Sequence, residues 1–165
     1  MSLDRIFRDL GIGSSTSREY WRTLENQKAC ELYYWKGKYY ISSVMAGENG
    51  CVSVAPMTKL DENALPAELG QAILDALANY SWTKDAVDWA QGRKRVLQFV
   101  GCKSWRGFEK DTIYLLVVLE GGIIDISYMW LNSREGFNKD THVTCSPIPE
   151  KIGEAVKSII QLMSK

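Results

Sequence analysis

The sequence predicts an α+β fold, in which antiparallel strands are followed by an amphipathic helix twice along the chain. Two observations carry this prediction. A stretch that reads PAELGQAI at residues 66–73 returns near the end as PEKIGEAV at residues 149–156. Strand-like sequence with glycine-containing turns precedes each copy, which is the pattern of paired antiparallel strands. We therefore expect an antiparallel sheet with amphipathic helices, built from two pseudo-repeated strand-strand-helix halves.

Length and composition suit a single domain spanning residues 1–165. The chain has 165 residues, of which 45% are hydrophobic. A globular chain of this size buries roughly 70% of its unfolded surface and needs no disulfide or metal to fold. Without a linker or low-complexity stretch between the halves, we expect pseudo-halves at about 28–80 and 94–163, after an N-terminal helical segment at 2–26.

The elements of the first half follow from apolar periodicity. Leu3, Ile6, Phe7 and Leu10 mark a short amphipathic helix that stops at Gly11, and residues 18–25 are a second helical candidate. Residues 29–35 and 38–45 flank a Lys-Gly turn and predict a β-hairpin. Residues 51–55 predict a short third strand.

The repeated stretch predicts one helix in each half. Its apolar residues follow the i, i+3, i+4, i+7 spacing of an amphipathic helix, and proline suits the first helical position. Gly70 and Gly153 each cost about 1 kcal/mol relative to Ala in a helix. They could be merely tolerated near a helix start, but the same position carries glycine twice. We therefore expect another backbone element to cross closely there.

The second half repeats the strand pattern. Residues 112–120 and 123–131 flank Gly121-Gly122, a dipeptide suited to a tight hairpin turn. Residues 113–119 are apolar on both faces and predict a central strand, and residues 142–145 predict a short last strand. Between the halves, Trp82, Ala86, Trp89 and Ala90 predict a helix that Ser81 or Thr83 caps and Gly92 ends.

The sequence offers little for catalysis, and we expect no enzymatic activity, no metal and no cofactor. The single histidine, His142, could be a general base, but no nucleophile or metal partner lies near it in sequence, and a surface histidine is the simpler interpretation. Gly11 and Gly13 lack the lysine and the preceding strand of a phosphate loop. The four cysteines form no C-x-x-C pair and predict reduced, mostly buried thiols: Cys30, Cys51, Cys102 and Cys145.

Charge and hydropathy restrict the partners. Twenty basic and twenty acidic residues cancel, so nucleic acid is an unfavoured partner. The triplet 93–95 is interpreted as the end of a helix that Asp85 and Asp88 open, although with Lys103 and Arg106 it could form a basic surface. The longest apolar stretch, residues 113–119, is too short to span a membrane. We expect no membrane contact and a cytoplasmic location.

The ending IPEKIGEAV at residues 148–156, together with its earlier copy, resembles a motif of bacterial contact-dependent growth inhibition immunity proteins. The stretch KRVLQFVGCKSW at residues 94–105 is also similar to a segment that opens that family's second half. The resemblance implies an immunity protein, which binds and neutralises a cognate toxin C-terminal domain, often a nuclease, delivered by neighbouring bacteria. It also implies a monomer or weak dimer that works without turnover.

We expect the toxin-binding surface at two segments that mix aromatic and charged side chains, Trp82, Asp85, Asp88 and Trp89, and Trp105, Arg106 and Glu109. The simpler interpretation of each is a core tryptophan or a solvated charge. Two other functions stay open. A secretion chaperone or adaptor would be a stable homodimer with an exposed apolar groove. A small hydrolase would gather His142 with carboxylates or cysteine in a pocket.

Overall fold

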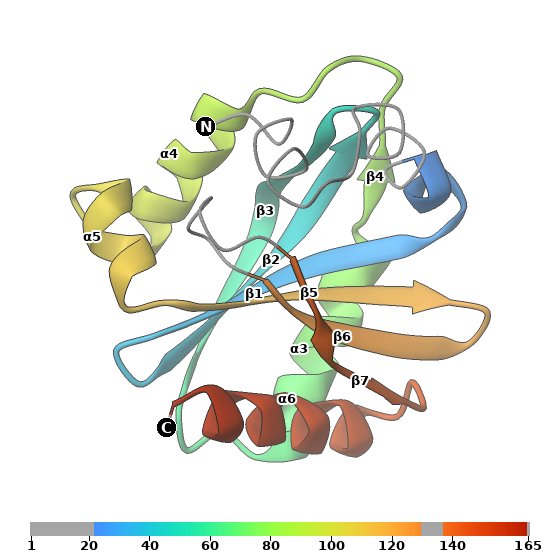
Figure 1. Cartoon of the computed structure of the whole chain (residues 1–165), viewed down its shortest axis with the longest axis vertical. Coiled ribbons are helices and arrows are strands. Elements are labelled where there is room, and N and C mark those ends of the chain that lie inside the picture. The colour runs from blue at the N-terminus through green and yellow to red at the C-terminus, as the bar shows by residue number, and fades with distance from the viewer. Residues whose placement is uncertain (1–21, 130–136, 165) are drawn as a thin grey trace.

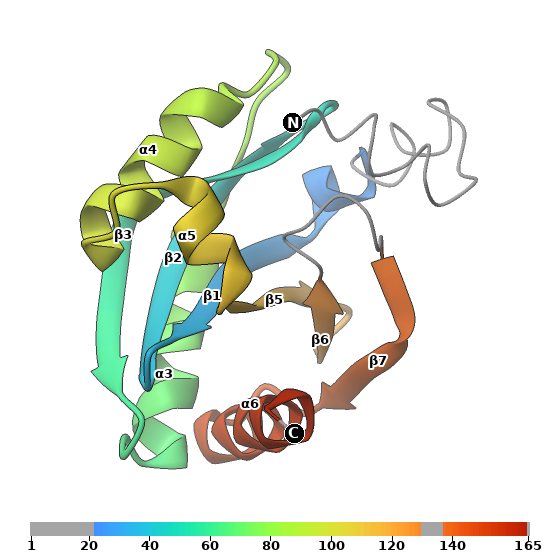
Figure 2. The same ribbon diagram turned by 60° about the vertical axis from the view of Figure 1, so that its left-hand side comes forward.

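The computed structural model describes residues 22–129 and 137–164, and confirms the α+β fold class. A strongly twisted, seven-stranded, mostly antiparallel sheet has helices packed on both faces (Figures 1 and 2). The predicted helix at residues 3–10 and Trp130 lie outside the described residues, and so do residues 18–21 of the candidate helix at 18–25. A short 3-10 helix, η1 (Leu24–Asn26), precedes the first strand.

The sheet joins the strands of the two halves at its centre. Its order is β3-β2-β1-β5-β6-β7. The first-half strands are β1 (Lys28–Trp35), β2 (Lys38–Gly47) and β3 (Gly50–Asp61). The second-half strands are β5 (Ile113–Glu120), β6 (Ile123–Met129) and β7 (Phe137–Cys145). β1 pairs antiparallel with β5, which confirms residues 113–119 as a central strand. A two-residue strand, β4 (Ser81–Trp82), pairs in parallel with β2.

The predicted hairpin turns are confirmed, whereas β3 and β7 are longer than predicted. Lys36 and Gly37 have φ of 48° and 71°, and Gly121 and Gly122 have φ of 57° and 77°, as tight two-residue hairpins require. β3 continues past Pro56 because its register against β2 shifts between Ser42 and Ser43. Pro56 therefore lies in a bulge of an edge strand, where its missing N–H breaks no ladder bond.

The repeated stretch forms two helices that cross on one face of the sheet, α3 (Pro66–Ala78) and α6 (Pro149–Met163). A Cβ added to Gly70 would lie 1.7 Å from the carbonyl oxygen of Pro149. A Cβ added to Gly153 would lie 1.9 Å from the carbonyl oxygen of Pro66. Each helix thus places its first residue against the glycine of the other, and the close crossing predicted from the repeat is confirmed. Apolar side chains of both helices, among them Leu69, Ile73, Ile152 and Val156, form the main core with the sheet.

The other face of the sheet is covered by α4 (Trp89–Val100) and α5 (Trp105–Lys110). The helix predicted to run from Trp82 to Gly92 is wrong, because Trp82 lies in β4 and α4 only begins at Trp89. Gly92 lies inside α4, where a Cβ would come within 2.9 Å of the Val52 Cβ. Close packing on β3, rather than helix termination, accounts for this glycine. α4 ends at Gly101, which has a left-handed φ of 78°.

Three further sequence expectations concern the thiols, the membrane and the acidic residues before α4. Cys30 and Cys51 are buried, Cys102 and Cys145 are partly exposed, and none forms a disulfide. None of the described helices has the length and apolarity that a membrane crossing requires. Asp85 lies in the loop before α4 and does not open a helix together with Asp88, which corrects the expectation that the two acids share a helical turn.

Candidate protein-binding surface

The two helices α4 and α5 contain four of the seven predicted toxin-binding residues, and a fifth, Asp88, directly precedes α4. α4 is held on β3 at Gly92 and through Arg95, whose Nη1 donates to the Ser53 carbonyl oxygen at 3.5 Å. Val96 and Val100 turn toward the sheet and are only 3% and 8% exposed. Because helix residues three and four apart share a face, the opposite side of α4 is left to solvent, with Gln91, Lys94 and Gln98 exposed.

A single phenylalanine anchors α5 to the sheet. Phe108 is fully buried, with its ring centroid 5.6 Å from that of Trp35 and 5.5 Å from those of Tyr33 and Trp105. The helix begins after Ser104, whose Oγ accepts from the Gly107 N–H at 3.1 Å. This anchoring leaves Arg106 exposed at the start of α5.

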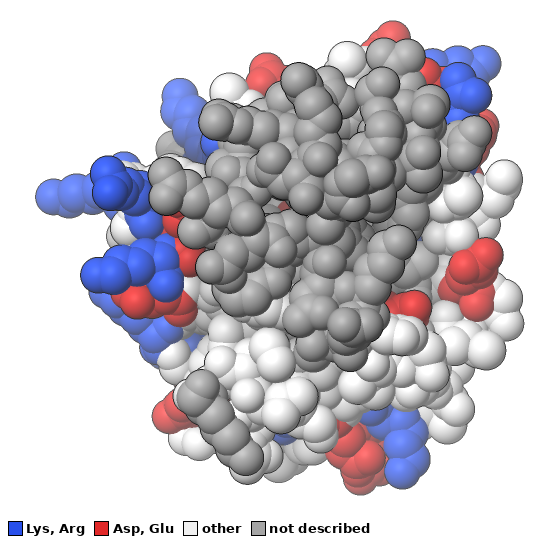
Figure 3. All heavy atoms as spheres, in the orientation of Figure 1, with Lys and Arg blue, Asp and Glu red and all other residues white. Residues whose placement is uncertain are grey.

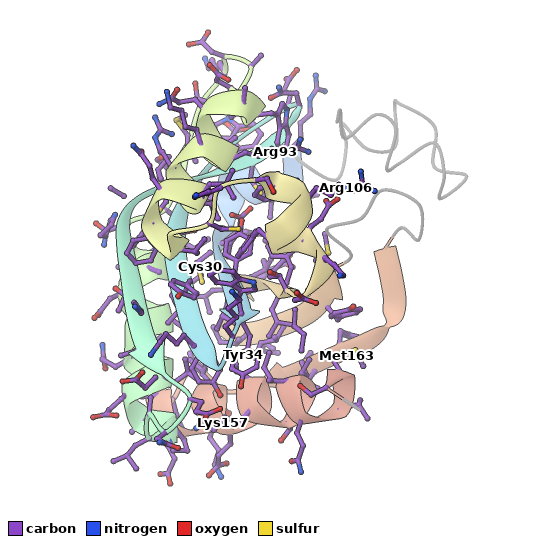
Figure 4. All side chains as sticks on the ribbon, turned by 90° about the vertical axis from the view of Figure 1, so that its left-hand side faces the viewer. Cys30, Tyr34, Arg93, Arg106, Lys157 and Met163 are labelled. Carbon is purple, nitrogen blue, oxygen red and sulfur yellow. The ribbon has the colours of Figure 1, made fainter. Side chains whose placement is uncertain are left out.

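An arginine–tryptophan contact links the two helices. The Arg93 guanidinium carbon lies 5.0 Å from the Trp105 ring centroid, within the range of a cation–π interaction. Arg93 is one helical turn after Trp89, and residues at this spacing share a helix face. The structure therefore brings Trp89 and Trp105, from the two predicted segments, to one side of the molecule. Figure 4 views this side, with Arg93 on α4 and Arg106 on α5.

Positive charge is concentrated on these two helices. Between residues 89 and 110 there are six basic residues and one acidic residue, Glu109. Figure 3 shows Lys and Arg side chains gathered at its left edge, where α4 and α5 lie in Figure 1. The described residues form four ion pairs, and none of them includes these six basic residues. We call the six residues the basic face: Arg93, Lys94, Arg95, Lys103, Arg106 and Lys110.

Two polar atoms beside the basic face are buried without a hydrogen-bond partner among the described residues, Trp105 Nε1 and Glu109 Oε2. Glu109 lies within α5. Buried polar groups in folded proteins nearly always have partners. These two atoms, in the middle of α5, are exceptions to that pattern.

The remaining predicted residues have structural roles. Trp82 is half-buried and packs against a small core cluster that includes Val44 and Cys51. The Asp85 N–H donates to Thr83 Oγ1 at 3.1 Å, which shapes the loop before α4. Asp88 caps α4, because its Oδ1 accepts from the Gln91 N–H at 3.1 Å. The aspartate side chains are exposed, so these roles leave both accessible to a partner.

The chain is similar to known proteins in its fold and not in its sequence. No protein-family model matches the sequence, and no curated protein matches it. Among solved structures, a protein of unknown function from Neisseria meningitidis has a TM-score of 0.68 and 18% identity, over 84% of this chain and 96% of that one. A chain of the CdiA-CT/CdiI toxin and immunity complex from Yersinia pseudotuberculosis has a TM-score of 0.64 and 14% identity, over 82% of this chain and 96% of that one.

The likeness is one of fold. At 18% and 14% identity, the comparison transfers no individual binding residue to this chain. The two neighbours nevertheless match over almost their whole length, so the architecture of the sheet and its helices is shared as a unit.

A buried polar cluster around Glu31, between β1, β3 and β5, was not predicted from the sequence. Glu31 is only 4% exposed. Its carboxylate accepts from Tyr33 Oη at 2.7 Å, from Tyr114 Oη at 2.8 Å and from the Ser53 hydroxyl. Burial, together with the charge of Glu31, raises the pKa of Tyr33 and of Tyr114 well above the ordinary tyrosine value. An acid in the middle of an apolar strand was the available signal, but its partners come from three distant segments.

The single histidine, His142, was the sequence candidate for a general base. His142 lies on β7 with Nδ1 3.4 Å from Asp125 Oδ1, and both side chains are about half exposed. Within the described residues, no group of three or more histidine, cysteine or acidic side chains could hold a metal ion.

Proposed function

We propose that this chain is an immunity protein that binds and neutralises a toxin domain. One observation carries the proposal. The fold matches, over 82% of the chain, a chain from a complex of a toxin with its immunity protein. The motif resemblance points to the same class, although its prolines and glycines serve the crossing of α3 and α6. The motif therefore supports the architecture, and the neighbouring complex supports the role.

Neutralisation requires tight binding without turnover. Binding energy in protein interfaces is concentrated in a few tryptophan, tyrosine and arginine side chains at rigid positions. α4 and α5 present such side chains on helices that Val96 and Phe108 hold to the sheet. We propose the surface around Trp89, Trp105 and Arg106 as the centre of the toxin contact. The protein would act in the bacterial cytoplasm, on a toxin domain that enters from a neighbouring cell.

The direct test is binding to the toxin domain itself. The domain to use is the C-terminal domain of any large surface protein that is encoded beside the gene for this chain. Titration calorimetry should give a one-to-one complex with a dissociation constant in the nanomolar range typical of tight inhibitors. A toxin C-terminal domain from an unrelated surface protein serves as the control and should not bind. Failure of the neighbouring domain to bind at micromolar concentration would remove the proposal.

Oligomeric state separates this proposal from the secretion chaperone hypothesis. An immunity protein of this size is expected to be monomeric alone and to form a heterodimer with its toxin. Size-exclusion chromatography with light scattering measures both masses. A stable homodimer that takes up a secreted protein in place of the toxin would favour the chaperone.

A further inference from the structure

We infer that the basic face of α4 and α5 docks an acidic surface of the toxin domain, outside any nucleic-acid-binding cleft of that toxin. The inference rests on the proposed function and specifies the contact. It identifies the toxin-binding surface of this chain and the chemistry of the surface that meets it.

The charge pattern gives the first argument. The whole chain is neutral, with 20 basic and 20 acidic residues, yet six of the basic residues and one acidic residue fall between residues 89 and 110. Elsewhere in the described chain, basic residues such as Arg22, Lys38 and Lys151 form ion pairs within 4.0 Å. None of the basic face does. Clustered like charges repel one another, and a partner's carboxylates would relieve that repulsion.

Preorganisation gives the second argument. The Arg93 guanidinium is already stacked on Trp105, so less side-chain freedom is lost when it binds a carboxylate. Lys94, Lys103 and Arg106 are exposed around this pair. A half-buried tryptophan and arginine ringed by exposed charges is the usual composition of a protein–protein hot spot.

The same charges favour an acidic protein surface over nucleic acid. A nucleic acid extends well beyond a patch of two short helices, and its affinity depends on many phosphate contacts. Outside residues 89–110 the chain has more acidic than basic residues, because the total is balanced. A long polyanion bound at α4 and α5 would meet that acidic excess, whereas a folded domain can present carboxylates to the basic face alone.

A nuclease toxin bound in this way would be inhibited sterically. A nuclease binds phosphates with basic residues in its cleft. The basic face would be repelled there, so it cannot inhibit by imitating the charge of nucleic acid. Contact with an acidic region beside the cleft would obstruct the substrate sterically.

The experiment is a matched pair of charge reversals. The variant Lys103→Glu/Arg106→Glu alters the basic face, and Lys28→Glu/Lys151→Glu makes the same change in net charge at exposed positions on β1 and α6. Biolayer interferometry against the immobilised neighbouring toxin domain measures both, and circular dichroism confirms that each variant is folded. We expect the first variant to weaken binding about tenfold or more, mainly through slower association. The second should stay within about threefold of the unaltered protein.

Each other outcome overturns the inference. Equal weakening of toxin binding by both variants would mean that the toxin responds only to the net charge of the chain. Unchanged binding by both variants would mean that the toxin contacts another surface. The proposed function would stand in both cases. Absence of binding by the unaltered protein would remove the proposed function as well. A labelled DNA or RNA duplex that binds the unaltered protein at 0.15 M salt but not the first variant, with toxin binding intact, would assign the face to nucleic acid.

Discussion

At the scale of single residues, the most unusual feature is a carboxylate buried without a cation. Glu31 is surrounded by hydroxyl groups of Tyr33, Tyr114 and Ser53, and by the Cys51 thiol at 3.4 Å. No arginine or lysine among the described residues forms an ion pair with it. Burying a charge is costly unless hydrogen bonds replace its hydration. Here several charge-assisted hydrogen bonds offset that cost and tie β1, β3 and β5 together.

Replacing Glu31 by glutamine tests this account. The variant keeps the shape but sets an amide N–H₂ donor against hydroxyl donors, so buried donors lose their acceptor. We expect Glu31→Gln to lower the free energy of unfolding by about 1–3 kcal/mol, measured by urea denaturation. The control, Glu120→Gln at the exposed end of β5, should change it by less than about 0.5 kcal/mol. Equal stability of the two variants would contradict the role given to Glu31.

The buried hydroxyls and thiols also predict a loss of stability at alkaline pH. Burial, and then the nearby Glu31 charge, raise the pKa of Tyr33, Tyr114 and Cys51 well above ordinary values. Ordinary values are about 8.5 for cysteine and about 10 for tyrosine. Above these, the unfolded chain loses protons that the folded chain retains.

These buried neutral groups therefore contribute their full stabilisation below about pH 8.5. As the pH rises toward their folded-state pKa values, the free energy of unfolding falls by up to about 1.4 kcal/mol per pH unit for each group. Urea midpoints measured between pH 7 and pH 10.5 should fall at the alkaline end, and the Cys51→Ala variant should show a shallower fall. A midpoint that is constant to pH 10.5 would refute this prediction.

At the scale of elements, the two copies of the repeated stretch stabilise each other. The first residue of α3 lies over Gly153 and the first residue of α6 lies over Gly70. Glycine weakens an isolated helix, but here it permits two backbones to approach more closely than any side chain would allow. The repeat is therefore visible in the sequence because one structural contact is made twice.

Helix propensity and packing make opposite predictions for Gly70→Ala. Propensity alone predicts a gain of about 1 kcal/mol. The added Cβ would lie 1.7 Å from the Pro149 carbonyl oxygen, so α3 and α6 would have to separate. We expect a loss of several kcal/mol, seen as a large fall in the thermal midpoint, and the same for Gly153→Ala. The exposed neighbour Gln71→Ala should change stability by about 0.5 kcal/mol or less. A gain in stability for Gly70→Ala would show that the crossing is looser than described.

The elements that the sequence predicted correctly are those determined by neighbouring residues. The hairpin turns depend on the residues in the turn, and the repeated helices depend on apolar spacing within each helix. The errors came from contacts between distant residues. Gly92 resembled a helix end, yet its role is to pack on Val52. The third strand was predicted to end at residue 55, yet β3 bulges past Pro56 on a sheet edge.

At the scale of the whole molecule, the net charge is zero but the charges are unevenly distributed. The sequence predicted Trp105 and Arg106 as binding residues, and the structure places Trp105 against Arg93 of the basic face. A basic surface formed by residues 93–95, Lys103 and Arg106 was only the alternative interpretation, because a helix set seven residues too early put the triplet 93–95 at a helix end. Glu31 could not have been assigned partners, since Tyr114 is 83 positions away along the chain.

Salt should weaken the toxin complex if the basic face makes the contact. Exposed charges more than about 8 Å apart are screened at physiological ionic strength. We expect the association rate with the toxin domain to fall steeply between low and high sodium chloride, while the dissociation rate changes little. A stopped-flow titration of tryptophan fluorescence would measure both rates. An association rate that is independent of salt would point to an apolar contact elsewhere.

Protection of growing cells tests the central claim most directly. The neighbouring toxin C-terminal domain is expressed from an inducible promoter in bacteria that also express this chain, its Lys103→Glu/Arg106→Glu variant or an unrelated immunity protein. We predict normal growth with the unaltered chain, reduced protection with the variant and growth arrest with the unrelated protein. Growth arrest in the presence of the unaltered, folded chain would contradict the immunity function.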